Sequence, residues 1–79
     1  MSKIVLVAGS DGERGQDGKK KVYEIIVEDN FVTLMWGKAE EARRQSKRTW
    51  FSNHSYAQMF ADEKKWEKIS RGYSVAYTA

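Results

Sequence analysis

The 79-residue sequence contains no cysteine and no proline. Without cysteine, neither a disulfide framework nor a thiolate metal site can stabilise the fold. The one histidine, His54, cannot build a zinc site alone, and no convincing nucleophile–base pair lies near it. We therefore expect no metal and no cofactor. We also expect that the protein is not an enzyme and takes no small-molecule substrate.

Long hydrophobic runs are missing as well. The run IVLV at residues 4–7 is far too short for a signal-peptide core or a transmembrane helix. We expect a cytoplasmic protein that does not enter a membrane, in keeping with the absence of disulfides. The length predicts one small domain spanning residues 1–79. Three Trp, four Tyr and three Phe are then expected to supply much of its core.

Positive charge is present in modest excess, with a net charge of +3. Its position along the chain is more informative than its total. The cations cluster at residues 19–21 and 43–48, whereas the acidic residues lie mainly elsewhere. Such clustering is typical of proteins that bind nucleic acid.

Alternating apolar residues predict four strands, at residues 3–7, 22–28, 31–36 and 45–51. The first is expected to be an edge or terminal strand. The second and third form a hairpin, whose turn contains Asn30 because asparagine tolerates the left-handed conformation. Residues 39–44 are expected to form a structured loop. Residues 9–18 carry glycine at every third position but lack the spacing of a phosphate or calcium loop, so we expect a flexible connector.

A helix is predicted from Ser55 to Arg71. Ser55 and Gln58 match a capping box, and Gly72 supplies a C-terminal stop. Apolar residues at helical spacing form two stripes: Ala57, Phe60 and Ala61, and Met59, Trp66 and Ile69. The alternating Tyr73, Val75 and Tyr77 predict a short closing strand. The simplest architecture is α+β, a small antiparallel sheet of three to five strands covered by one helix.

The residues with the clearest binding chemistry lie at the end of the third strand. Trp36 offers a flat stacking surface, Gly37 allows close approach of a ligand to the backbone, and Lys38 adds a charge. A basic segment follows. The candidate site consists of Trp36, Gly37, Lys38, Arg43, Arg44, Lys47, Arg48 and Trp50. The alternatives are that Trp36 belongs to the core, that Arg48 contacts a ring within the protein, and that the cations form a solvated face.

Several segments in order resemble the WGR domain, which is named for a Trp-Gly-Arg signature and occurs in poly(ADP-ribose) polymerases and small bacterial proteins. Residues 21–25, KVYEI, resemble its K-F-Y-E-I strand, and Trp36-Gly37-Lys38 resembles its signature with lysine in place of arginine. Residues 45–51 resemble its next strand. Ala57, Lys68 and Gly72-Tyr73 match residues of its helix and closing turn. The resemblance spans residues 3–78, although the loop at 39–44 differs from that of the family.

The resemblance implies that Trp36 contacts a terminal sugar or base of DNA, with Lys38 as the nearby cation. Our leading hypothesis is a nucleic-acid-binding module that contacts mainly phosphates, with little sequence specificity. DNA is favoured over RNA, and single- and double-stranded ligands both remain open. The alternative is a small protein-interaction domain or phage-type inhibitor that docks on an acidic partner, because exposed aromatic residues beside arginines are also typical of protein hot spots.

Overall fold

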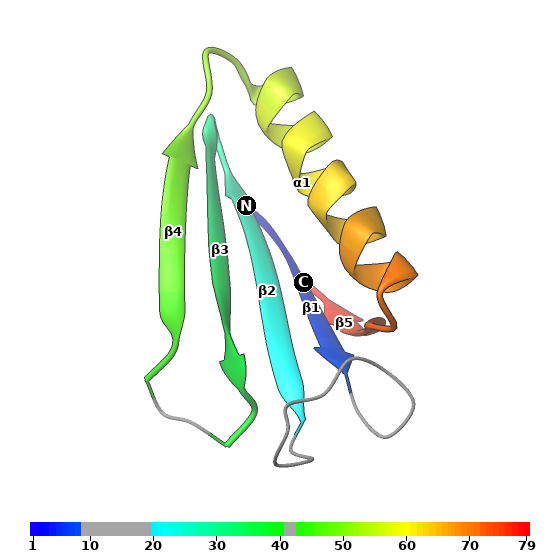
Figure 1. The fold of residues 1–79 in the computed structure, drawn as a ribbon. Helices are drawn as coiled ribbons and strands as arrows, with labels where there is room; N and C mark the ends of the chain where they lie inside the picture. The colour runs from blue at the N-terminus through cyan, green and yellow to red at the C-terminus, as the bar shows by residue number, and fades with distance from the viewer. Residues whose placement is uncertain (9–19, 41–42) are drawn as a thin grey trace.

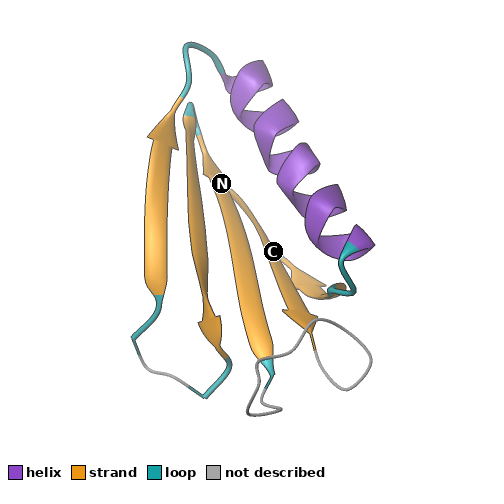
Figure 2. Ribbon diagram, in the orientation of Figure 1, coloured by secondary structure: helices purple, strands orange, loops and turns teal. Residues whose placement is uncertain are grey.

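The computed structural model describes residues 1–8, 20–40 and 43–79 and has an α+β fold (Figures 1 and 2). Five antiparallel strands form one sheet, and one helix in the C-terminal half packs against it. The elements are β1 (Ser2–Ala8), β2 (Lys21–Glu28), β3 (Phe31–Lys38), β4 (Gln45–Trp50), α1 (His54–Ser70) and β5 (Ser74–Thr78). The expected flexible connector at residues 9–18 lies outside the described residues.

The strand order in the sheet is β4-β3-β2-β1-β5. β1 pairs with both β2 and β5 and is therefore an interior strand. Residues 3–7 were predicted to form an edge or terminal strand, and this position in the sheet was wrong. The nearly continuous apolar sequence of β1 fits an interior strand better than an edge. A register shift between Val5 and Leu6 makes Tyr77 the partner of Val5 and Val75 the partner of Leu6. Tyr77 and Val75 therefore belong to opposite faces of the sheet.

The β2–β3 hairpin turns through Asp29 and Asn30, as expected from the sequence. The positive φ of 53° belongs to Asp29, however, and not to Asn30. Pairing continues without interruption from Glu28–Phe31 to Lys21–Lys38. The third strand is consequently longer than the predicted 31–36, because it includes Gly37 and Lys38.

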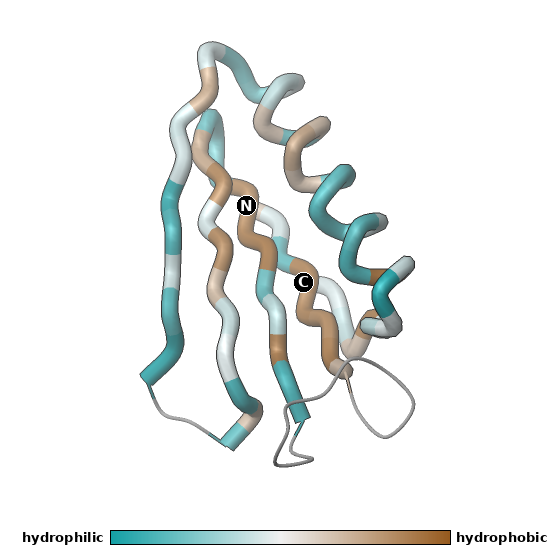
Figure 3. The backbone as a smooth tube through the Cα atoms, in the orientation of Figure 1, coloured by the Kyte–Doolittle hydropathy of each residue, from teal (hydrophilic) through white to brown (hydrophobic). Residues whose placement is uncertain are grey.

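Helix α1 covers one face of the sheet, which we call the helix face; the other is the open face (Figure 1). Ala57 and Ala61 are fully buried one turn apart, and their small side chains let the helix approach β2 and β3 closely. Figure 3 shows that hydropathy falls across the sheet from β1 to the almost wholly polar β4. The core cluster on the helix face comprises Leu6, Ala8, Tyr23, Ile25, Val27, Val32, Leu34, Ala57, Ala61 and Tyr73.

The N-cap predicted for α1 was wrong, whereas the predicted C-terminal stop was confirmed. The N-cap is Asn53, whose side chain accepts a hydrogen bond from the Tyr56 amide at 2.9 Å, so the prediction of Ser55 was wrong. At the other end, Gly72 has a φ of 103° and provides the predicted stop. The amide of Gly72 donates to the Ile69 carbonyl, and that of Tyr73 donates to the Lys68 carbonyl. This Schellman motif fixes Tyr73 beside the last turn of the helix.

Candidate functional site

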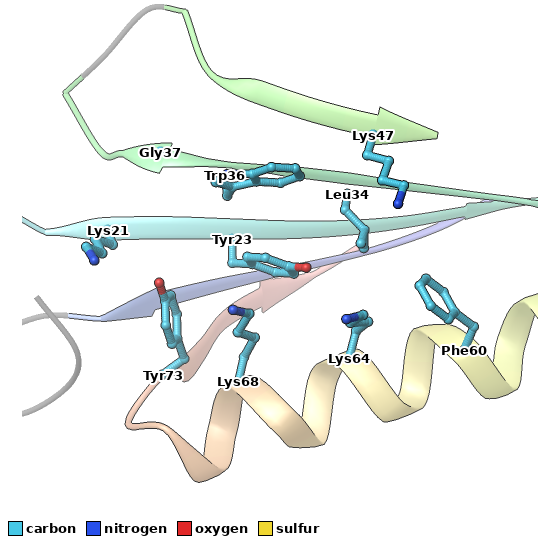
Figure 4. Close-up of a pocket in the computed structure, with 10 residues that line it drawn as sticks. All are labelled: Lys21, Tyr23, Leu34, Trp36, Gly37, Lys47, Phe60, Lys64, Lys68 and Tyr73. Atoms are coloured by element: carbon cyan, nitrogen blue, oxygen red, sulfur yellow. The ribbon is translucent and has the colours of Figure 1, made fainter. Parts of the chain in front are cut away.

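A pocket of about 530 Å³ opens between α1 and the sheet on the helix face (Figure 4). Strands β2, β3 and β4, the helix and the turn after it all contribute to it. Four lysines and four aromatic residues line it, and no carboxylate does. The lining residues are Lys21, Tyr23, Leu34, Trp36, Gly37, Lys47, Phe60, Lys64, Lys68 and Tyr73.

The aromatic part of the pocket is built on the β2–β3 pairing. Tyr23 and Trp36 are cross-strand partners, and their rings stack at 6.2 Å between centroids with an interplanar angle of 21°. Tyr73 meets Tyr23 edge-on at 6.3 Å. Trp36 is half-buried and packs against the core, so it is both a core residue and a pocket residue. The two interpretations of Trp36 from the sequence, as a core residue and as a binding residue, are therefore compatible.

The lysines reach the pocket from three elements. In Figure 4, Lys64 and Lys68 extend from α1 toward the sheet, and Lys47 extends from β4. The Lys68 ammonium lies 4.6 Å from the Tyr23 ring centroid, a cation–π distance. Lys64 lies 3.6 Å from a Glu67 carboxylate oxygen. Within the part of the chain that the structure describes, Lys47 and Lys68 form no ion pair with a carboxylate.

Tyr23 is the residue of the pocket whose titration is clearly perturbed. Burial raises the pKa of its phenol above the ordinary value of 10.0, and the Glu67 carboxylate and Tyr73 add to the shift. The phenol therefore stays neutral at physiological pH. A neutral phenol in this position can donate a hydrogen bond to an anionic ligand.

Six of the eight residues predicted as one site lie in strands and are divided between the two faces of the sheet, whereas Arg43 and Arg44 precede β4. Strand pairing places Trp36, Lys38 and Lys47 on the helix face, where Trp36 and Lys47 line the pocket. The same alternation places Gly37, Arg48 and Trp50 on the open face, although the backbone of Gly37 also lines the pocket. A strand exposes successive residues to opposite sides, so the compact cluster in the sequence is divided in space.

Arg44 has a structural role on the open face. Its Nη1 donates to Glu24 Oε2 at 2.7 Å, and its Nη2 donates to the Ala39 carbonyl at 3.2 Å. Lys3 completes the group, with Nζ at 3.0 Å from the other Glu24 oxygen. Glu24 is only 8% exposed, and the pairing raises the pKa of Lys3. Arg44 is thereby committed to neutralising a nearly buried carboxylate.

Gly37 is required by this arrangement. A Cβ atom at position 37 would lie 3.2 Å from Arg44 Cγ, and the φ of Gly37 is 158°. The Arg44 side chain therefore passes over β3 at the residue that has no side chain of its own. The predicted role of Gly37, close approach to the backbone, is met within the protein by Arg44.

Sequence reasoning did not include most of the pocket residues in the candidate site. These residues are Lys21, Tyr23, Leu34, Phe60, Lys64, Lys68 and Tyr73. Lysines at 64 and 68 are spaced one helical turn apart, a pattern that by itself indicates an ordinary charged surface. The pocket could have been predicted only by placing Lys64 and Lys68 opposite the face of β2 that carries Tyr23. That placement requires the correct docking of the helix on the sheet.

Comparison with known proteins gives information about the fold. No protein-family model matches the sequence, and no curated protein matches it significantly. A crystal structure of a Bacteroides fragilis protein is similar, with a TM-score of 0.78 at 24% identity over 95% of this chain. The match covers 19% of that chain, so the present sequence spans a small part of its length. At this level of identity the similarity establishes the fold alone.

Residues 1–8, 20–40 and 43–79 contain neither a cluster of metal ligands nor a helix that could span a membrane. Within these ranges there is no group of three or more His, Cys, Asp or Glu residues placed to hold a metal ion. Helix α1 has 17 residues and is mostly polar on its outer side, and no described helix is long and apolar enough to cross a membrane.

Proposed function

We propose that the protein is a nucleic-acid-binding module, similar to a WGR domain, that binds phosphate groups in the lysine-lined pocket beside Trp36. The observation that carries this proposal is the composition of the pocket, in which four lysines surround stacked aromatic rings without any carboxylate in the lining. Ammonium groups bind phosphate as point charges, and aromatic rings accept a base or a sugar. DNA is favoured over RNA by the resemblance.

The size of the pocket supports a terminal nucleotide as the bound part of the ligand. About 530 Å³ lies within the range of small-molecule sites, and the pocket is open to one side. The half-buried Trp36 lines the pocket and also contacts Tyr23 and the core. An interior duplex segment has no terminal base to place there. The resemblance to WGR domains leads to the same expectation, with Trp36 against the end of a strand.

The test is a fluorescence-anisotropy titration at two salt concentrations with blunt duplex DNA, single-stranded DNA and RNA. Lys47→Ala and Lys68→Ala, each made as a single substitution, should weaken binding and reduce the salt slope by about one for the phosphate that is no longer neutralised. Lys65→Ala is the matched control, since Lys65 lies at 5.0 Å over the Trp66 ring and does not line the pocket. Equal decreases in affinity for the pocket variants and the control would show only a general charge effect and would reject the proposal.

Protein docking is a second candidate function, supported by the outer side of α1. Tyr56, Met59 and Trp66 are all exposed there, and their spacing of three and seven residues aligns them along the helix. Exposed aromatic residues of this kind form hot spots in protein interfaces. Capture of one specific protein that survives nuclease treatment and is abolished in Trp66→Ala would support this function.

A further inference from the structure

A second aromatic and basic surface lies on the open face, at the strands farthest from β5. We call it the β3–β4 platform, and it consists of Phe31, Arg48 and Trp50. The Arg48 guanidinium carbon lies 4.0 Å from the Phe31 ring centroid, so the planar group covers this ring. Trp50 is the cross-strand partner of Phe31 and is 61% exposed. The platform therefore presents an indole next to a guanidinium plane supported by a phenyl ring.

The spacing along β4 suits a chain of bases. Arg48 and Trp50 are two residues apart on the same side of the strand, a separation of roughly 7 Å. Two flat groups at this separation can each receive one base of an extended strand. In a duplex the faces of the bases are stacked on one another, and only unpaired bases are free to stack on protein side chains.

The charge around the platform favours a phosphate backbone. Among residues 43–53 there are four cations and no acidic residue. Arg44 is paired with Glu24, but Arg43 and Arg48 form no ion pair with a described carboxylate. Glu28 on β2 is the cross-strand partner of Phe31, so one acidic residue borders the platform. Lys47 lies on the helix face, so Arg43 and Arg48 are the cations of this segment that remain for phosphates.

We propose that the β3–β4 platform binds single-stranded nucleic acid, with bases stacked on Trp50 and Arg48 and the phosphates running along β4. This site is separate from the lysine-lined pocket, because it occupies the opposite face of the sheet. It does not depend on the function proposed for the pocket. Exposure alone does not distinguish Trp50, since Trp66 is also 61% exposed but lies among both acidic and basic residues of α1.

The test is an NMR titration of the whole protein, labelled with ¹⁵N, with an oligothymidylate about eight nucleotides long that lacks terminal phosphates. The three tryptophans give three indole N–H signals, which Trp→Phe variants assign. We expect the Trp50 signal to shift and the Trp66 signal to stay in place. Anisotropy should show a decrease of about 5- to 150-fold in affinity for Trp50→Ala. The matched variant Trp66→Ala should bind as the unmodified protein does.

The other outcomes would overturn the inference. A shift confined to Trp36 would assign the oligonucleotide to the pocket and leave the platform without this ligand. Unchanged affinity in Trp50→Ala would exclude stacking at this residue. If the Trp50 signal stays in place and capture of a protein is abolished in Trp50→Ala, the platform recognises protein. Unchanged duplex binding in the pocket variants would contradict the proposed function and would not affect the Trp50 result.

Discussion

On the helix face Trp36 stacks against Tyr23 and is half-buried beside four lysines, whereas on the open face Trp50 is exposed beside Arg48. The cations differ as well as the burial. Lysines line the pocket, where compact ammonium groups suit phosphate, and the arginines of the open face use their planar groups to cover Phe31 and to pair with Glu24. Residues adjacent in the sequence therefore serve two different surfaces when they lie in strands.

The largest expected difference between the faces is in stability, and the neighbouring Ile25 and Ile26 test it. Ile25 is 1% exposed on the helix face, whereas Ile26 is half-buried on the open face. Ile25→Ala should lower the free energy of unfolding by about 2–5 kcal/mol, because it leaves a cavity in the core. Ile26→Ala should cost less than about 2 kcal/mol. Urea denaturation measures the free energy of unfolding of both variants. Equal decreases would mean that side chains on the open face contribute as much to stability as those on the helix face.

A smaller effect on stability is expected from a substitution of Gly37 in β3. Gly37→Ala should destabilise the protein by about 1–2 kcal/mol, because the added Cβ would contact Arg44 Cγ at 3.2 Å and the backbone would be strained. Thermal and urea denaturation would measure the destabilisation. Ser46→Ala is the control, since Ser46 is exposed on the same face of β4 and should change stability by less than about 0.5 kcal/mol. A Gly37 variant as stable as the control would contradict this account.

The smallest expected effect is a decline of stability at alkaline pH, which arises on both faces for different reasons. Burial raises the pKa of Tyr23, and pairing with Glu24 raises the pKa of Lys3. Each contribution is complete below the unfolded value, 10.0 for Tyr23 and 10.5 for Lys3, and is lost as pH rises through the folded pKa. Unfolding by urea between neutral pH and about pH 11 would measure the decline.

Tyr23→Phe should reduce this decline by removing the contribution of the helix face. Lys3→Met should reduce it by removing that of the open face. If neither variant alters the pH dependence of stability, then the Tyr23 phenol and the Lys3 ammonium do not cause the decline. Burial of Tyr23 and pairing of Lys3 with Glu24 would then not raise these two pKa values.

The elements of the fold could be predicted because their periods are clear in the sequence. Alternation identified the strands, and the uninterrupted segment before Gly72 identified the helix. The error at the N-cap has a local cause: both Asn53 and Ser55 can cap a helix, and their sequence does not show which side chain faces the first free amides. The place of β1 in the sheet depended on pairing with β5, which local sequence does not encode.

The candidate site could be predicted only in part. Trp36, Gly37 and Lys47 were identified from their residue types, and all three line the pocket. Arg44 was included for its charge, but its partner Glu24 is 20 residues away in the sequence. Lys64 and Lys68 were omitted because a surface helix with alternating charges is common. Only the packing of α1 on β2 and β3 brings these lysines to Trp36.

The passage of Arg44 over Gly37 has a consequence for how this sequence can vary. The two positions are thermodynamically coupled, so a side chain at position 37 should be tolerated better when residue 44 is small, and a double-mutant cycle would reveal the coupling. In related chains the residues at 37 and 44 should covary. A glycine after the tryptophan would then indicate that an arginine side chain passes over the strand at that position, whether or not any ligand binds beside it.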